Sequence, residues 1–161
     1  MPERTLTPSA IRVVIPSRRR VQVLAACALR LFPGATVTVA EAEMDDYAPV
    51  CAEHDVELIP HPDEVTGIAP IRQWVLDVFD EECILFVDDD VYKLRSALGY
   101  RGMDLTDAGV ARRVVENAAT IARGIGTSFF GFNQASGDVR KFRPYKPFLL
   151  NSWAGGVVGI V

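Results

Sequence analysis

Three consecutive aspartates, Asp88, Asp89 and Asp90, directly follow the apolar run from Cys83 to Val87. Carboxylates this close repel one another, so keeping them ionised costs free energy unless a cation neutralises them. Mg²⁺ and Mn²⁺ prefer oxygen ligands and usually keep coordination positions open for phosphate oxygens. The stretch ILFVDDDV therefore predicts a divalent-metal site that handles a phosphorylated substrate. The simpler alternative is an acidic loop that caps a strand and binds nothing.

The spacing of the aspartates and of the residues after them distinguishes between the known kinds of metal site that could contain this stretch. An EF-hand loop needs the pattern D-x-[DN]-x-[DN]-G, but Tyr92 and Lys93 occupy its fifth and sixth positions, so a calcium loop is excluded. A haloacid-dehalogenase-type phosphatase resembles D-x-D-x-[TV] after its first strand. Asp88 and Asp90 fit that motif, but Tyr92 replaces the Thr or Val and the motif follows the fourth predicted strand. A phosphohydrolase is therefore the weakest of the functional hypotheses.

The elements that must position these aspartates alternate along the chain. Runs rich in β-branched residues predict strands at 11–15, 35–40, 56–59, 83–87 and 127–132, with a last strand-like run at 157–161. Helical periodicity predicts helices from 21 to the Pro33-Gly34 stop, and at 47–54, 70–79 and 107–123. Pro60 and Pro62 are expected to break the third strand. This alternation predicts an α/β fold with a mixed, mainly parallel sheet flanked by helices.

Polar residues follow several of the predicted strands at the point where each strand ends. Ser17 and the arginines Arg18, Arg19 and Arg20 follow the first strand, Glu41 and Glu43 follow the second, and the aspartates follow the fourth. Ligands of open α/β sheets bind outside the carboxyl ends of the strands. The sequence therefore places the aspartates at a binding edge.

The composition limits the class of protein. With 161 residues, 49% of them hydrophobic and 24% charged, the chain 1–161 is expected to form a single globular domain. The net charge of −4 and the pI of about 5.2 provide no global attraction for nucleic acid. Contact with a polyanion would therefore depend on two local basic patches, 18–20 and 140–146, either of which could simply be a solvated surface.

Three cysteines, Cys27, Cys51 and Cys83, are odd in number and widely spaced in apolar surroundings, which favours reduced thiols and a cytoplasmic protein. The start of the chain lacks a signal-peptide profile, and no apolar run reaches the roughly 20 residues of a membrane span. We therefore expect no membrane partner. Because the chain stops on the strand-like run VVGIV, we expect it to be truncated at its C-terminus.

Four stretches in order, IRVVIPSRRR, VAEAE, GIAPIRQWVLD and ILFVDDDV, together resemble the GT-A fold glycosyltransferases with their D-x-D motif. Nucleotidyltransferases share that Rossmann-like architecture but carry a glycine-rich loop after the first strand, where this chain has Pro16, Ser17 and Arg18. With DAGVARRVVENAATIARGIG and GFNQ included, the chain most resembles the TET-associated glycosyltransferases. Those enzymes are encoded largely by phages and resemble DNA modifiers that place sugars on hydroxymethylated pyrimidines.

The resemblance implies a metal-dependent transferase that uses a nucleotide sugar, with a UDP-sugar as the expected donor. Asp90 would ligate Mn²⁺ or Mg²⁺, and Asp88 would share the metal or reach the ribose. The residues implied to bind the nucleotide sugar are Pro16, Ser17, Arg18, Glu41, Arg72, Asp88 and Asp89. Two of these have a simpler interpretation, since Arg72 could face solvent and Glu41 could be a surface acid at a strand end.

The same resemblance implies a hydroxyl acceptor, hydroxymethylated pyrimidine in DNA, and a location in the cytoplasm of a phage-infected or other bacterial cell. An inverting reaction needs a general base, which in similar enzymes follows the glycine-rich strand that WAGGVVGI resembles, so we expect the base downstream of Val161. The segment FFGFNQASGDVRKFRPYKPF could bind nucleic acid through its aromatic and basic residues or could pack on the sheet. A non-catalytic GT-A-like module that binds a nucleotide sugar or nucleic acid is the alternative from another functional class.

Overall fold

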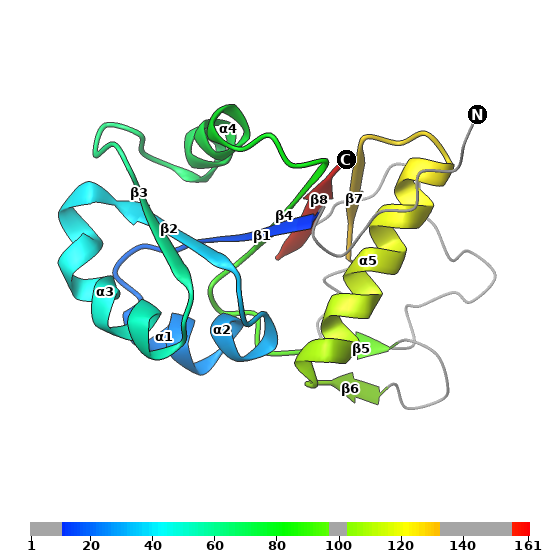
Figure 1. The fold of residues 1–161 in the computed structure, drawn as a ribbon, viewed down its shortest axis with the longest axis horizontal. Coiled ribbons are helices and arrows are strands. Elements are labelled where there is room, and N and C mark those ends of the chain that lie inside the picture. The colour runs from blue at the N-terminus through cyan, green and yellow to red at the C-terminus, as the bar shows by residue number, and fades with distance from the viewer. Residues whose placement is uncertain (1–10, 97–102, 133–155) are drawn as a thin grey trace.

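A six-stranded sheet forms the centre of the computed structural model, which describes residues 11–96, 103–132 and 156–161 (Figure 1). The strand order is β3-β2-β1-β4-β8-β7. The strands are β1 (Ile11–Pro16), β2 (Thr36–Ala40), β3 (Glu57–His61), β4 (Cys83–Val87), β7 (Phe129–Gly131) and β8 (Val157–Ile160). The first four run parallel, whereas β8 is antiparallel to both β4 and β7. The predicted mixed, mainly parallel sheet is confirmed.

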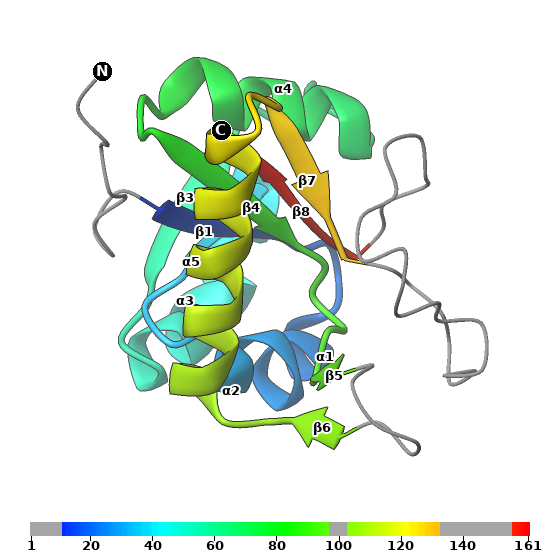
Figure 2. The ribbon, with the colours of Figure 1, turned by 90° about the vertical axis from the view of Figure 1, so that its right-hand side faces the viewer.

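Helices cover both faces of this sheet. They are α1 (Val21–Ala26), α2 (Ala28–Leu31), the 3₁₀ helix η2 (Glu41–Glu43), α3 (Met44–Glu53), α4 (Ile68–Val78) and α5 (Ala108–Gly124). Among the described helices, α4 covers one face, and α1, α2, α3 and α5 cover the other (Figures 1 and 2). Successive side chains of β4 point to opposite faces of the sheet. Leu85 packs against the helices on one face, and Ile84 and Phe86 pack with Val75 of α4 on the other.

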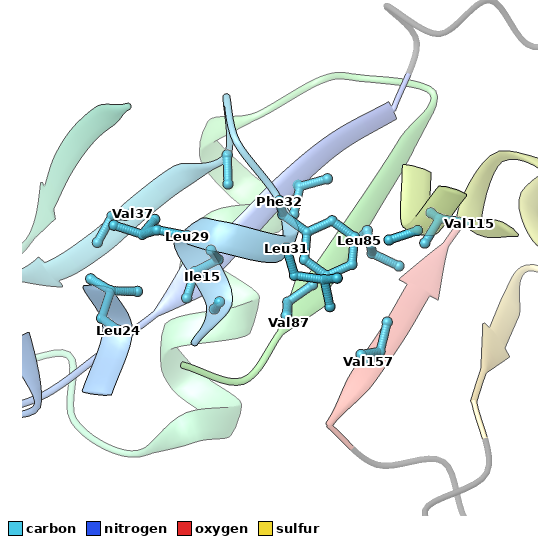
Figure 3. Close-up of a cluster of buried hydrophobic side chains, with 14 of the residues drawn as sticks. Ile15, Leu24, Leu29, Leu31, Phe32, Val37, Leu85, Val87, Val115 and Val157 are labelled. Carbon is cyan, nitrogen blue, oxygen red and sulfur yellow. The ribbon is translucent and has the colours of Figure 1, made fainter. Parts of the chain in front are cut away.

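The larger hydrophobic cluster fixes β1, β2 and β4 against the helices (Figure 3). Its members include Ile15, Leu24, Leu29, Leu31, Phe32, Val37, Leu85, Val87, Val115 and Val157, none more than 4% exposed. Full burial of each such aliphatic or aromatic side chain contributes about 1.5–3 kcal/mol. The last apolar residues of β1 and β4, Ile15 and Val87, are 0% exposed. The polar residues that follow them therefore extend from rigid supports.

Two of the predicted elements are wrong in detail. The helix expected from residue 21 is divided at Cys27, whose φ of −116° and ψ of −89° interrupt it between α1 and α2. Strand β3 continues through Pro60, which pairs with Val39, although proline was expected to break it. A proline is tolerated there because β3 lies at the edge of the sheet and pairs with β2 alone.

A small antiparallel pair of strands that was not predicted from the sequence follows the aspartates. It pairs β5 (Leu94–Ser96) with β6 (Met103–Leu105), and Lys93 and Arg95 both form ion pairs with Asp104. Strands of three residues are too short to display a hydrophobic period. For the same reason the strand expected at 127–132 was overextended, since only β7 is extended and paired there.

The three cysteines are free thiols, with Cys51 and Cys83 buried and Cys27 half-buried. Burial raises the pKa of Cys83 to about 11, so its thiol stays protonated at neutral pH. Among the described residues, no helix is both long and apolar enough to cross a membrane. The basic patch 140–146 and residues 153–155 of the stretch WAGGVVGI lie outside the described residues.

Candidate functional site

The aspartates lie at the edge where the parallel strands end. Val14 pairs with Phe86 in the β1–β4 register, so Pro16 ends β1 at the level of Asp88. Pro16 in turn pairs with Thr38 of β2, and Glu41 follows three residues later. The predicted convergence of the first, second and fourth strand ends is therefore present in the fold.

Asp88 is held by its backbone and by an arginine from α4. Its N–H donates to the Gly156 carbonyl at 2.7 Å, and its Oδ1 lies 3.3 Å from Nη2 of Arg72. The side chain remains 40% exposed. Burial raises the pKa of Asp88; the charge of Arg72 opposes this shift, and the negative charges of Asp90 and Asp89 add to it. Asp88 therefore has an accessible carboxylate that benefits from a neighbouring cation.

Arg72 packs against the sheet and only 30% of its side chain is exposed. Its guanidinium carbon lies 5.4 Å from the centre of the Phe86 ring, a cation–π contact. Its Nε is buried and has no hydrogen-bond partner among the described residues. The Arg72 guanidinium therefore lies between the Phe86 ring and Asp88 rather than facing solvent alone.

Asp89 differs from its two neighbours because it is only 5% exposed. Its Oδ2 accepts a hydrogen bond from the Ser17 hydroxyl at 2.7 Å, and its Oδ1 lies 2.8 Å from Nη1 of Arg20. Both carboxylate oxygens are therefore engaged by the loop that follows β1.

Tyr47 of α3 completes this cluster. Its hydroxyl lies 2.9 Å from Ser17 Oγ and accepts the backbone N–H of Arg20, also at 2.9 Å, and the residue is 0% exposed. The Ser17 N–H donates to the Thr38 carbonyl at 3.0 Å. The loop after β1 is therefore tied to β2, α3 and the end of β4.

Asp90 is the most open of the three aspartates, with 56% of its side chain exposed and its Oδ2 3.1 Å from Nη2 of Arg20. The second oxygen of Asp90 and that of Asp88 contact no hydrogen-bond donor among the described residues. No group of three or more metal-binding side chains occurs in the same ranges. Mg²⁺ sites commonly use one or two carboxylates together with substrate phosphates. The pair fits an ion shared with a phosphate and does not form a cage made only of protein ligands.

The other predicted site residues are placed less centrally. Pro16 is half-buried at the end of β1, and the exposed Glu41 side chain in η2 forms no hydrogen bond or ion pair with any described residue. The Arg18 side chain is 63% exposed and lies 3.8 Å from Glu43, which belongs to η2. These three residues lie at the same edge, but no side-chain hydrogen bond or ion pair joins them to Asp88 or Asp90.

Three residues with clear contacts at this edge were not among the predicted site residues: Arg20, Glu43 and Tyr47. Arg20 belongs to the basic run that was noted, but nothing in the sequence distinguishes it from Arg18. Glu43 accepts the backbone N–H of Arg19 at 2.8 Å, and Arg19 has a positive φ of 54°. That bond supports a backbone conformation that residues other than glycine rarely adopt.

No protein-family model matches the chain, and no curated protein sequence matches it. Among solved structures, the crystal structure of residues 1–349 of S. aureus TarS is 14% identical with a TM-score of 0.39, over 74% of this chain and 34% of that one. Its complex with UDP-GlcNAc is also 14% identical at a TM-score of 0.39, over 77% and 35% of the two chains. A further S. aureus TarS structure is 15% identical at 0.36, over 71% and 19%. The chain thus spans about a third or less of these structures, and similarity this low carries no argument by itself.

Proposed function

We propose that this chain is a metal-dependent glycosyltransferase domain of the GT-A type, which moves a sugar from a UDP-sugar to a hydroxyl acceptor. One observation carries the proposal. Asp88 and Asp90 present accessible carboxylates at the carboxyl end of β4, beside the end of β1 and under an arginine from α4. This is the place where open α/β sheets bind their ligands.

The described residues have distinct roles in the proposed donor complex. Asp88 and Asp90 would hold Mn²⁺ or Mg²⁺ through the oxygens that Arg72 and Arg20 leave free. Such an ion, when bound, offsets the negative charge that develops on the departing nucleoside diphosphate. Both arginines present guanidinium groups suited to hydrogen bonding with phosphate oxygens.

The nucleoside would lie across the ends of β1 and β2. Pro16 closes β1 beside Asp88, and the exposed Glu41 begins η2 directly after β2. The Glu41 side chain forms no hydrogen bond or ion pair within the described part of the chain. Its carboxylate is therefore available to accept hydrogen bonds from a base or a ribose. A surface acid that is already paired with an arginine would not be available in this way.

The acceptor part of the proposal is hydroxymethylated pyrimidine in DNA, and it is supported by the sequence resemblance. The basic and aromatic segment 129–148 would contact the acceptor, and its residues 133–148 lie outside the described residues. The proposal assigns the general base to none of the described residues.

Calorimetry with UDP-glucose, with and without Mn²⁺, tests the donor site. We expect binding that requires Mn²⁺, that Asp90→Asn weakens at least about 100-fold (about 2.7 kcal/mol), and that Asp77→Asn leaves intact. Asp77 is a matched control, because it is an exposed aspartate on α4 that contacts only Gln73 among the described residues. Absence of Mn²⁺-dependent binding to the wild-type chain would overturn the proposal.

Transfer of radiolabelled glucose to hydroxymethylated DNA, with unmodified DNA as the control, then tests the acceptor. Labelling confined to the hydroxymethylated duplex is the expected result. Tight metal-dependent binding without transfer to any hydroxyl acceptor would favour the non-catalytic binding module.

A further inference from the structure

Both carboxylate oxygens of Asp89, the middle residue of the D-x-D stretch, already bind other side chains of the protein. Asp89 is buried, and its two oxygens are engaged by Ser17 and Arg20 at 2.7 and 2.8 Å. A metal ion or a ribose hydroxyl could reach Asp89 only by displacing one of these partners. Charge-assisted hydrogen bonds of this length are among the stronger ones in proteins, so displacement is costly.

The hydrogen bonds that end at Asp89 have only one consistent direction. The Arg20 backbone N–H can only donate, so the Tyr47 hydroxyl accepts it. The single Tyr47 proton then goes to Ser17 Oγ, and the Ser17 proton goes to Asp89 Oδ2. The chain of hydrogen bonds therefore runs from Arg20 through Tyr47 and Ser17 and requires an acceptor at its end.

Arg20 closes this chain into a ring. Its backbone begins the chain, and its guanidinium returns to Asp89 Oδ1 while a second nitrogen of the same group reaches Asp90 Oδ2 at 3.1 Å. The position of Asp90 is therefore linked to the loop after β1 through the arginine. The same ring fixes the turn that also carries Asp88 and Asp90.

We propose that Asp89 is a positioning residue that binds no part of the donor and instead locks the loop after β1 to the end of β4, which holds Asp88 and Asp90 at the open edge. The positioning role rests on the proposed function of Asp88 and Asp90. The hydrogen-bonded ring itself does not depend on that function.

Two substitutions break the ring at different links. Asp89→Asn keeps the shape of the side chain. When the new amide oxygen faces Arg20, its NH₂ group faces Ser17 and cannot accept the Ser17 hydroxyl proton. The chain must then reverse, and the Tyr47 proton is left without an acceptor. Tyr47→Phe removes the acceptor of the Arg20 N–H and leaves all three aspartates intact.

A double-mutant cycle on UDP affinity, measured by calorimetry in saturating Mn²⁺ at a temperature where every variant is folded, separates positioning from ligation. We expect each single variant to weaken binding about tenfold and the double variant to be no weaker than the worse single one, because either change opens the same ring. If Asp89 touches the donor or the metal, Asp89→Asn will lose far more affinity than Tyr47→Phe and the two effects will multiply. That result would overturn the inference.

Amide hydrogen exchange of Arg20 in the metal-free chain supplies a readout that needs no ligand. Asp89→Asn should raise the exchange rate of the Arg20 N–H without touching that amide, because the unsatisfied Tyr47 proton and the lost charge on residue 89 loosen the ring that holds it; Asp77→Asn should not. An unchanged rate would overturn the ring. If the rate rises while the wild-type chain binds no UDP with Mn²⁺, the proposed function fails, and with it the positioning role, although the ring itself remains.

Discussion

Ser17 and Asp89, 72 positions apart in the sequence, are joined by a buried hydrogen bond of 2.7 Å at the carboxyl edge of the sheet. Ser17 directly follows β1, and Asp89 lies two residues after the end of β4. The two central parallel strands are therefore linked at the edge where the candidate site lies. The buried middle aspartate supports this link, and its exposed neighbours remain available to ligands.

Loss of the Tyr47 hydroxyl should destabilise the folded chain. In Tyr47→Phe the part-buried Arg20 N–H loses its acceptor, and Ser17 Oγ loses the buried hydrogen bond from the same hydroxyl; each such hydrogen bond contributes about 0.5–1.5 kcal/mol. Urea denaturation should show a fall of this size in the free energy of unfolding. Tyr92→Phe is the control, since Tyr92 is 59% exposed, and it should change stability by less than about 0.5 kcal/mol. Equal stability of both variants would contradict the bonding of Tyr47.

Removal of Arg72 should raise the pKa of Asp88 further. Burial already raises that pKa, and the charge of Arg72 opposes the rise, so Arg72→Met removes an opposing interaction. Carbon-13 NMR of the Asp88 carboxyl during a pH titration of the metal-free chain measures the change. A lower or unchanged pKa in Arg72→Met would show that the ion pair is absent in solution.

The same shift fixes the sign of a pH effect on stability. The folded-state pKa of Asp88 lies above its unfolded value, so the folded chain binds this proton more tightly. The resulting stabilisation is present below the unfolded pKa and is lost as the pH rises through the folded pKa. Asp88→Asn should therefore remove a small part of the free energy of unfolding that the wild type gains at low pH. If the free energy of unfolding of Asp88→Asn depends on pH in the same way as that of the wild type, this prediction is wrong.

Arg12 should matter for stability and not for ligand binding. At the amino end of β1 it forms ion pairs with Glu81 and Glu57, the latter at 2.7 Å, and lies 4.3 Å from the centre of the Phe79 ring. Arg12→Met should lower the free energy of unfolding by about 1–3 kcal/mol, because Glu81 is left without its cation. Since the substitution lies at the opposite edge, UDP affinity should stay at the wild-type value. Weaker UDP binding with unchanged stability would contradict this separation of the two edges.

Gly159 should not tolerate a side chain. It lies in β8 between Leu85 of β4 and Phe130 of β7, and an added Cβ would come within 2.2 Å of two ring carbons of Phe130. Overpacking of this kind costs about 1–3 kcal/mol. Thermal unfolding of Gly159→Ala should show the loss, and adding Phe130→Ala should make the Gly159 substitution nearly neutral. If Gly159→Ala destabilises the chain equally with Phe130 and with Ala at position 130, the steric clash is not with Phe130.

Local patterns predicted most of the sheet and the position of the aspartates. The continuous apolar run 83–87 indicated a strand covered on both faces, and β4 is fully buried between α4 and the other helices. The parallel arrangement then required the residues after β1, β2 and β4 to meet at one edge. The hydrophobic period of each strand and the alternation of strands with helices can be read from short stretches of sequence, which explains why these predictions succeeded.

The contacts within the site could not be predicted in the same way. That Asp89 is buried while Asp88 and Asp90 are open depends on Ser17, Arg20 and Tyr47, which reach it from two other elements. Three identical aspartates give no local signal of this difference. The path of β3 through Pro60 likewise depends on its edge position in the sheet, which is a property of the tertiary structure.

The most direct test of the central claim is an electron paramagnetic resonance titration of Mn²⁺ with the chain in the presence of UDP, in which bound Mn²⁺ loses its aqueous signal. The account predicts that the wild-type chain and Asp77→Asn remove the aqueous signal only when UDP is present, and that Asp88→Asn and Asp90→Asn both fail to do so. Equal loss of the signal with Asp90→Asn would contradict the claim that these two carboxylates hold the metal and the nucleotide together.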